Sequence, residues 1–193
     1  MEYLWLTIGW IIYFAMHSLL AIRQVKSYAF SHGVSAQRYR LAFNIIALIT
    51  LLPILIISTN IQSDYALEPN KALKFSGLIL AGYGVVLGKR AFKSYDTKAF
   101  LGLGPLKGEA VFKTDGLLRH VRHPLYSASI LILAGYFLFD PKWNTLLSVS
   151  MLTLYFIVGS YFEERKLIRE FGEKYMKYKQ QTPMFIPKFW RRS

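Results

Sequence analysis

Five apolar segments, each close to the length that crosses a lipid bilayer, constrain this chain more than any other feature of its sequence. They cover residues 3–22, 41–61, 72–92, 125–139 and 144–162. A membrane-crossing helix needs about 20 predominantly apolar residues, and a soluble domain of 193 residues would not normally carry several such runs. We therefore expect an all-α fold, an integral membrane bundle of five transmembrane helices.

The first apolar segment has the apolarity of a secretory signal peptide but not its flanking charges. Glu2 is the only charged residue before Arg23, whereas a signal peptide begins with a basic region. The run is also long enough to span a bilayer. We interpret residues 3–22 as the first membrane helix.

The last two apolar segments are separated only by residues 140–143, which read Asp-Pro-Lys-Trp. Such a sequence is typical of a turn. A short connection between two helices makes an antiparallel hairpin, whose two ends lie at the same face of the membrane. The pattern predicts a C-terminal helical hairpin followed by a helical tail.

Basic residues are concentrated in three segments that five alternating spans would place on one side of the membrane. Residues 23–40, 89–124 and 163–193 hold 21 of the 24 Lys and Arg residues. Because basic loops remain in the cytoplasm, the N-terminus is expected outside and the C-terminus inside. Attraction to an anionic leaflet also accounts for the net charge of +13, so we expect no nucleic-acid partner.

The absence of cysteine limits the kinds of site that the chain can build. The chain has no cysteine, which excludes disulfides, thiolate metal ligands and cysteine nucleophiles, and we expect no bound metal. No internal repeat or second domain is visible. We expect one membrane domain over residues 1–193, with a cytoplasmic loop over 93–124 and a cytoplasmic tail over 163–193.

Two polar motifs lie at the two ends of the predicted hairpin. Arg122, His123 and Pro124 precede its first helix, and Glu163 and Glu164 follow its second. Each has a purely structural interpretation, as a helix start with interfacial polar residues and as a solvated helix extension. Two adjacent carboxylates at the end of a span are also costly unless they face water, a cation or a ligand. We predict that the hairpin brings both motifs into one site.

An aromatic stripe follows in the tail. Tyr175 and Tyr178 are three residues apart, and Phe171 precedes them at helical spacing. The stripe either anchors an amphipathic helix at the membrane surface or closes over a cationic ligand through cation–π attraction.

Taken in order, these motifs resemble a known family. The pattern is Gly116-x5-Arg122-His123-Pro124-x-Tyr126, then, after the hairpin, Glu163-Glu164-x2-Leu167-x3-Phe171-Gly172-x2-Tyr175-x2-Tyr178-x4-Pro183. It is similar to the isoprenylcysteine carboxyl methyltransferase superfamily, which includes phospholipid methyltransferases. The similarity covers roughly residues 80–187.

The resemblance implies S-adenosylmethionine as the cofactor. Its pocket would be lined by Arg122, His123, Pro124, Tyr126, Glu163, Glu164, Tyr175 and Tyr178. Carboxylates accept hydrogen bonds from ribose hydroxyls or the amino group, and Arg or His meets the methionine carboxylate.

Motifs upstream resemble a bacterial branch of the superfamily, which implies a bacterial inner membrane. His17-Ser18, Arg38-Tyr39-Arg40, Ser94-Tyr95-Asp96 and residues 100–103 are similar to methanethiol S-methyltransferases and NnrU-like membrane proteins. Two positions depart from the relatives. Gly104-Pro105 stands where the thiol enzymes carry Arg-Gln, and Gln181 stands where prenylcysteine enzymes carry an Arg that holds a substrate carboxylate. An amide cannot form that charged clamp.

We therefore predict a membrane methyltransferase that uses S-adenosylmethionine and acts on a lipophilic or thiol small-molecule acceptor. Its other expected partners are membrane lipids. The acceptor atom is a carboxylate oxygen, a thiol sulfur or a lipid amine. A thiol or amine needs a base, for which His17, His123 or a glutamate is the candidate. His17, Glu164 and Gln181 are the residues expected to act on the acceptor. Two alternatives stay open: an NADPH-dependent membrane reductase of the sterol-reductase type, and a non-catalytic NnrU-like membrane protein.

Overall fold

The computed structural model describes residues 1–93, 97–104 and 112–187. Within these ranges the chain is helical and forms no strand beyond one isolated antiparallel bridge between Tyr65 and Lys142, which confirms the all-α prediction. Two predicted features, the Ser94-Tyr95-Asp96 motif and Pro105, lie outside the described residues.

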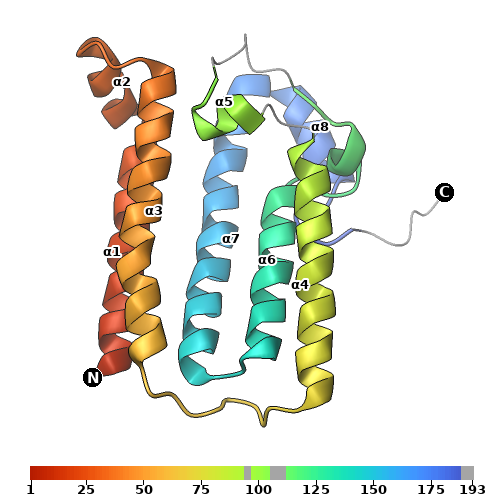
Figure 1. Cartoon of the computed structure of the whole chain (residues 1–193). Coiled ribbons are helices and arrows are strands. Elements are labelled where there is room, and N and C mark those ends of the chain that lie inside the picture. Colours follow the sequence, from red (N-terminus) through yellow and green to blue (C-terminus); the bar gives the residue numbers. More distant parts are fainter. Residues whose placement is uncertain (94–96, 105–111, 188–193) are drawn as a thin grey trace, which may run out of the picture. The chain divides into compact units, whose positions relative to one another are not determined.

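The described helices follow one another along the chain as Figure 1 labels them. They are α1 (Glu2–Ala21), α2 (Arg23–Ser31), α3 (Ala36–Asn60), α4 (Lys71–Phe92), α5 (Thr97–Leu101), the 3-10 helix η1 (Gly116–Arg119), α6 (Pro124–Phe139), α7 (Trp143–Phe171) and α8 (Glu173–Gln181). The chain divides into two compact units. The first contains residues 1–66, 95–109 and 142–148, and the second contains residues 67–94, 110–141 and 149–193.

Within the described ranges, four helices are long and apolar enough to cross a membrane, which is consistent with an integral membrane protein by length and composition. These are α1, α3, α4 and α7. The fifth predicted span, α6, is an apolar helix of 16 residues, below the about 20 residues that a crossing helix needs. The count of five spans therefore stays a prediction.

Two helices extend beyond their apolar segments. The Ser35 side chain accepts a hydrogen bond from the backbone N–H of Arg38 at 3.3 Å and caps α3. This cap starts the helix at Ala36, five residues before the predicted span at residue 41. At the other end of the chain, α7 continues to Phe171 and stops before Gly172, whose φ of 55° lies in the left-handed region. Apolarity predicted the membrane-length part of each helix and missed its polar extension.

In the first unit, polar contacts join the start of α7 to α1 and to the end of α3. The indole N–H of Trp10 donates to the Ser148 hydroxyl at 3.1 Å, and the Asn144 amide donates to the Ser58 carbonyl at 2.8 Å. The Tyr3 hydroxyl lies 2.8 Å from that of Ser63. Satisfied polar groups of this kind join helices where no hydrophobic driving force acts between them.

In the second unit, α4 and α6 pack backbone against backbone. A Cβ atom built on Gly135 would lie 2.5 Å from the carbonyl oxygen of Gly77 and 2.6 Å from the amide nitrogen of Ala81. A Cβ atom on Gly84 would lie 2.9 Å from the carbonyl oxygen of Ala128. Small residues of this type allow membrane helices to approach closely. This packing fixes α6, whose first turn carries part of the site.

Replacing Gly135 with alanine is therefore expected to destabilise the protein. The added methyl group meets backbone atoms that cannot rotate away, and overpacking of this kind costs about 1–3 kcal/mol. The melting temperature in detergent should fall by several degrees. Gly82 is the matched control, because a Cβ atom there meets nothing within 4 Å. Equal melting temperatures for Gly135→Ala and Gly82→Ala would contradict the close packing.

Candidate functional site

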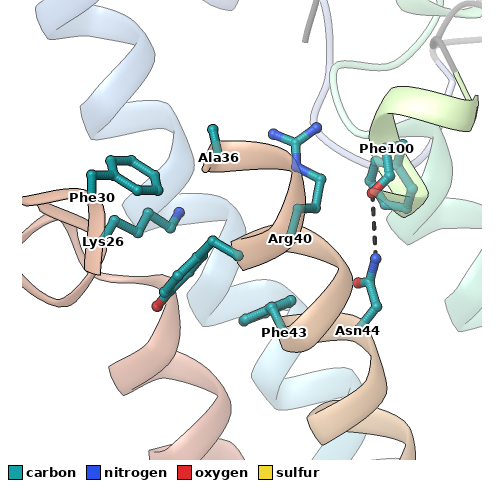
Figure 2. A pocket seen from close by; sticks show the side chains of 8 residues that line it. Lys26, Phe30, Ala36, Arg40, Phe43, Asn44 and Phe100 are labelled. Atoms are coloured by element: carbon teal, nitrogen blue, oxygen red, sulfur yellow. Dashed lines mark hydrogen bonds between the residues drawn. The ribbon is translucent and has the colours of Figure 1, made fainter. Parts of the chain in front are cut away.

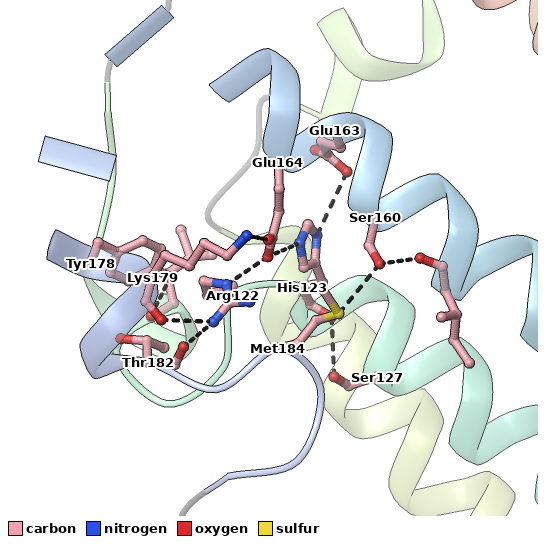
Figure 3. A network of polar contacts seen from close by, with 12 residues as sticks. Arg122, His123, Ser127, Ser160, Glu163, Glu164, Tyr178, Lys179, Thr182 and Met184 are labelled. Carbon is pink, nitrogen blue, oxygen red and sulfur yellow. Dashed lines mark hydrogen bonds and ion pairs between the residues drawn. The ribbon is translucent and has the colours of Figure 1, made fainter. Parts of the chain in front are cut away.

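A buried carboxylate, that of Glu164, is the centre of a polar network in the second unit (Figure 3). Its side chain is only 1% exposed. Arg122 donates from Nε to Oε1 at 2.6 Å, and the Lys179 ammonium group lies 2.7 Å from Oε2. The Nε2 atom of His123 lies 3.3 Å from Oε1. A buried charge is costly unless it is paired and hydrogen-bonded, and both conditions hold here.

The hairpin of α6 and α7 creates this juxtaposition. The two helices run antiparallel in Figure 1, and Arg122 and His123 precede α6 while Glu163 and Glu164 lie in the last turns of α7. Pro124 occupies the first position of α6, where its missing N–H costs nothing, and His123 is the N-cap residue. The structure thus brings together the two motifs that the sequence placed at the ends of one hairpin.

His123 is held between the carboxylates and an aromatic stack. Its Nδ1 atom lies 3.6 Å from the Glu163 carboxylate. Its ring stacks on Tyr126, with centroids 5.5 Å apart and planes at 10°, and Tyr126 stacks in turn on Phe156 at 5.4 Å. Burial lowers the pKa of His123 below its ordinary value, although the carboxylates of Glu163 and Glu164 oppose that shift. The imidazole of His123 is therefore neutral at neutral pH.

Residues 178–185, which we call the tail strap, are bound along residues 118–127. The backbone N–H groups of Arg122 and His123 donate to the carbonyls of Pro183 and Met184 at 2.9 and 3.1 Å. The Arg122 guanidinium also donates to the carbonyls of Lys179, at 3.1 Å, and Thr182. Two further hydrogen bonds hold the strap: the Ser127 hydroxyl donates to the Phe185 carbonyl at 2.7 Å, and the Tyr178 hydroxyl donates to the Leu118 carbonyl at 2.6 Å. Arg122 therefore ties α7 and the strap to the start of α6.

An aromatic cluster surrounds Tyr175 beside this network. Its members are Phe112, Phe171, Tyr175 and Tyr178, with ring centroids 5.1 to 6.0 Å apart. Tyr175 is 2% exposed, and its hydroxyl has no hydrogen-bond partner within the described ranges. Burial, with the nearby Glu164 carboxylate, raises the pKa of Tyr175 above its ordinary value. The hydroxyl is thus a neutral buried donor, and leaving such a group unsatisfied is costly.

Two predicted residues, Gln181 and His17, are not members of this network. Gln181 is the last residue of α8 and is exposed. His17 belongs to α1 in the first unit, where its ring lies 4.6 Å from that of Phe43 and 5.9 Å from that of Tyr13. The roles predicted for His17 and Gln181 on the acceptor stay predictions.

Sequence reasoning missed two members of the site. Lys179, which pairs with Glu164, is one of nine basic residues in the tail, and nothing in the sequence distinguishes it from the others. Phe112 lies in the long loop and completes the aromatic cluster.

The model of the phospholipid methyltransferase family matches residues 73–174, just over half of the chain. The chain belongs to the phospholipid methyltransferase family. The match includes α4, α6 and α7, with His123 and Glu164, and it ends one residue before Tyr175. The predicted superfamily resemblance is thereby confirmed.

Several curated relatives of this family member are bacterial methanethiol S-methyltransferases. One from Bradyrhizobium diazoefficiens is 40% identical over 89 residues, which is 42% of this chain and 27% of that protein. One from Crocosphaera subtropica is 37% identical over 91 residues, 46% of this chain and 32% of that protein. The aligned part thus covers about a third or less of each relative's length. No solved structure matches the chain.

The stability of this family member should depend on the protonation of His123. The pKa of His123 is lowered on folding, so the unfolded chain takes up the proton first as the pH falls below about 6.5. Stability is therefore retained above that pH and declines below it. We expect the melting temperature to fall more between pH 7.5 and 5.5 in the wild type than in His123→Gln. An identical pH dependence in both proteins would contradict a buried neutral imidazole.

Proposed function

We propose that this protein is an S-adenosylmethionine-dependent membrane methyltransferase that acts on a membrane-accessible acceptor. The observation that carries the proposal is the network of Arg122, His123 and Glu164, which the tail strap covers at one end of the hairpin. Membership of a methyltransferase family and relatives named as methyltransferases support it.

The side chains fit a methyl donor that carries an amino group, a carboxylate and ribose hydroxyls. S-adenosylmethionine supplies a methyl group activated on a sulfonium. Glu163, with 47% of its side chain exposed, and the unpartnered Tyr175 hydroxyl have hydrogen-bonding capacity left. Carboxylates accept from amines and hydroxyls, and a neutral tyrosine donates to a carboxylate or a ring nitrogen. We assign cofactor binding to these two residues and to His123.

Arg122 and Glu164 have a different part in this proposal. Each is already satisfied by the other, by Lys179 or by the carbonyls of the strap. We assign them the positioning of the strap over the donor. Positioning and exclusion of water provide most of the rate of a displacement that needs little covalent chemistry from the protein.

We propose a small thiol as the first acceptor to test, because the relatives are named as methanethiol S-methyltransferases. A thiol must lose its proton as its sulfur takes the methyl group. A neutral His123 that donates from Nε2 to the Glu164 carboxylate can accept that proton at Nδ1, on the side of the more exposed Glu163. A carboxylate acceptor needs no base, and a lipid amine needs the same proton transfer as a thiol.

The membrane topology is also part of the proposal. We propose that α6, although short, is a fifth span within one membrane domain, that the N-terminus lies outside and that the C-terminus lies in the cytoplasm of a bacterial cell. The charge distribution of the three basic segments supports this orientation.

Binding of S-adenosylmethionine to detergent-purified protein, measured by isothermal titration calorimetry, tests the site. Glu163→Gln and Tyr175→Phe should each weaken binding about tenfold, because each removes one hydrogen bond to the donor, charge-assisted for Glu163. Glu170→Gln is the matched control, since Glu170 is exposed on the same helix. Binding unchanged by either site variant would contradict the assignment, and a melting temperature raised by NADPH instead would favour a reductase.

The acceptor is identified by methyl transfer from labelled S-adenosylmethionine to a panel of small thiols, prenylcysteines and phospholipid amines. We expect a volatile or lipid-soluble thioether from the thiols. Label found only in prenylcysteine or phospholipid would change the acceptor class, and no label in any product would favour a non-catalytic protein.

A further inference from the structure

Three side chains form one nearly parallel stack of rings that runs from α7 across α6 to the polar network. The Phe156 ring lies 5.4 Å from that of Tyr126, with planes at 14°. The Tyr126 ring lies 5.5 Å from that of His123, with planes at 10°. Offset stacking of this kind is a preferred arrangement of aromatic pairs. Phe156 is thus linked to the imidazole of His123 through the ring of Tyr126.

We propose that Phe156 is a positioning residue for His123, because through Tyr126 it fixes the plane of the imidazole ring. The inference rests on the proposed function, in which neutral His123 takes the proton of a thiol acceptor. That proton passes to Nδ1 as the thiol sulfur takes the methyl group, and the donor is left as a neutral thioether. The ring plane determines whether Nδ1 points toward the acceptor, and a general base must lie within hydrogen-bond reach of its proton.

The backbone of His123 is fixed, but this alone leaves the ring plane undetermined. Its N–H donates to the Met184 carbonyl at 3.1 Å, and its carbonyl accepts from the N–H and the hydroxyl of Ser127 at 2.9 and 3.1 Å. The torsion that turns an imidazole about its Cβ–Cγ bond has broad minima. The Phe185 ring, 6.0 Å away and tilted by 47°, does not share the plane. The nearly parallel ring of Tyr126 is therefore the contact that sets it.

In this plane the two ring nitrogens face different carboxylates. Nε2 lies 3.3 Å from the Glu164 carboxylate, and Nδ1 lies 3.6 Å from that of Glu163. Arg122 and Lys179 lie 2.6 and 2.7 Å from Glu164 and keep it ionised. An ionised carboxylate only accepts hydrogen bonds. Neutral His123 therefore carries its proton on Nε2 and has the lone pair of Nδ1 for the acceptor.

One helix carries both the outer ring of the stack and the carboxylate. Phe156, Ser160 and Glu164 follow one another at four-residue spacing, so they share one face of α7. Ser160 is fully buried on this face. Groups that project from one helix keep their separation more precisely than groups on loops. The imidazole of His123 is thus held between two groups whose spacing α7 fixes.

The test is the tautomer of His123, read by nitrogen nuclear magnetic resonance of the histidine side chains in the intact, detergent-purified protein. His123→Gln identifies its signals among those of the four histidines. We expect the proton on Nε2 in the wild type, with neither donor nor acceptor present. Phe156→Leu keeps an apolar side chain but removes the ring, and it should increase the share of the tautomer protonated at Nδ1. Phe156→Tyr keeps the ring and should restore the wild-type signals.

Two other leucine variants are matched controls. Phe162→Leu removes an exposed ring from the same helix and should leave the His123 signals unchanged. Phe43 lines a pocket of the first unit (Figure 2), and its ring lies 4.6 Å from that of another histidine, His17. Phe43→Leu should therefore change the His17 signals and not those of His123.

Methyl transfer from S-adenosylmethionine to methanethiol is measured with the same variants. In Phe156→Leu, kcat should fall about tenfold, less than the about 100-fold or more that a general base contributes, and it should recover in Phe156→Tyr. Unchanged His123 signals in Phe156→Leu would overturn the positioning role, whether or not the protein transfers methyl groups. Altered signals with an unchanged kcat would overturn its part in the reaction. Altered signals in a protein that methylates no acceptor would support the positioning and count against the proposed function alone.

Discussion

Replacing Glu164 with leucine should lower the free energy of unfolding by about 3–5 kcal/mol, the cost of breaking a buried ion pair by removing one partner. The carboxylate is 1% exposed and joins Arg122, Lys179 and His123. Its loss leaves the Arg122 guanidinium, 8% exposed, facing an apolar side chain. Unfolding in detergent, followed by far-UV circular dichroism, measures the change.

Two further variants separate the effect of breaking the ion pair on stability from the effect of losing side-chain volume. Glu170→Leu, at an exposed position of the same helix, should change stability by less than about 0.5 kcal/mol. The double variant Glu164→Leu/Arg122→Met should be more stable than the sum of its single changes predicts, because the guanidinium that Glu164→Leu alone leaves unpaired is then also absent. Additive effects would mean that Arg122 and Glu164 do not depend on each other.

Replacing Arg122 with lysine should reduce methyl transfer about 100-fold while the protein stays folded. The guanidinium meets the Glu164 carboxylate and the carbonyls of Lys179 and Thr182 at once. An ammonium group is a point charge without that planar fork, so it cannot hold all three. Displacement of the tail strap by about 1 Å is enough for a loss of this size.

Hydrogen exchange distinguishes this positioning role from general destabilisation. In Arg122→Lys the amides of residues 182–185 should exchange faster, whereas those of α4 should be unchanged. Arg165→Lys is the matched control, since Arg165 is exposed beside Glu164. Full activity with a protected strap in Arg122→Lys would show that Arg122 does not position the strap.

The hairpin and its polar ends were the part of the site that the sequence could predict. The Asp-Pro-Lys-Trp turn and two flanking apolar runs are local signals, and an antiparallel connection places His123 opposite Glu164 whatever the details of packing. The positions of Glu163 and Glu164 followed from the same geometry.

The tail strap could not be predicted in the same way. Arg122 and Ser127 donate to its backbone carbonyls, and its own Tyr178 donates to the Leu118 carbonyl. A carbonyl is present at every residue, so no sequence pattern marks the ones that accept. Lys179 could not be identified as a partner of Glu164 for a related reason. Every basic residue of the tail carries the same charge, and only the fold determines which one lies beside Glu164. Helix ends were misplaced where polar caps and extensions, as at Ser35 and in the last turns of α7, override the apolar pattern.

The central claim is that a methyl donor binds where α6 and α7 meet the tail strap. Hydrogen–deuterium exchange of the intact protein, with and without S-adenosylhomocysteine, tests it most directly. We expect slower exchange in residues 118–127 and 175–185 and no change in α1 or α3. Protection confined to α1 and α3, or no protection anywhere at saturating ligand, would contradict it.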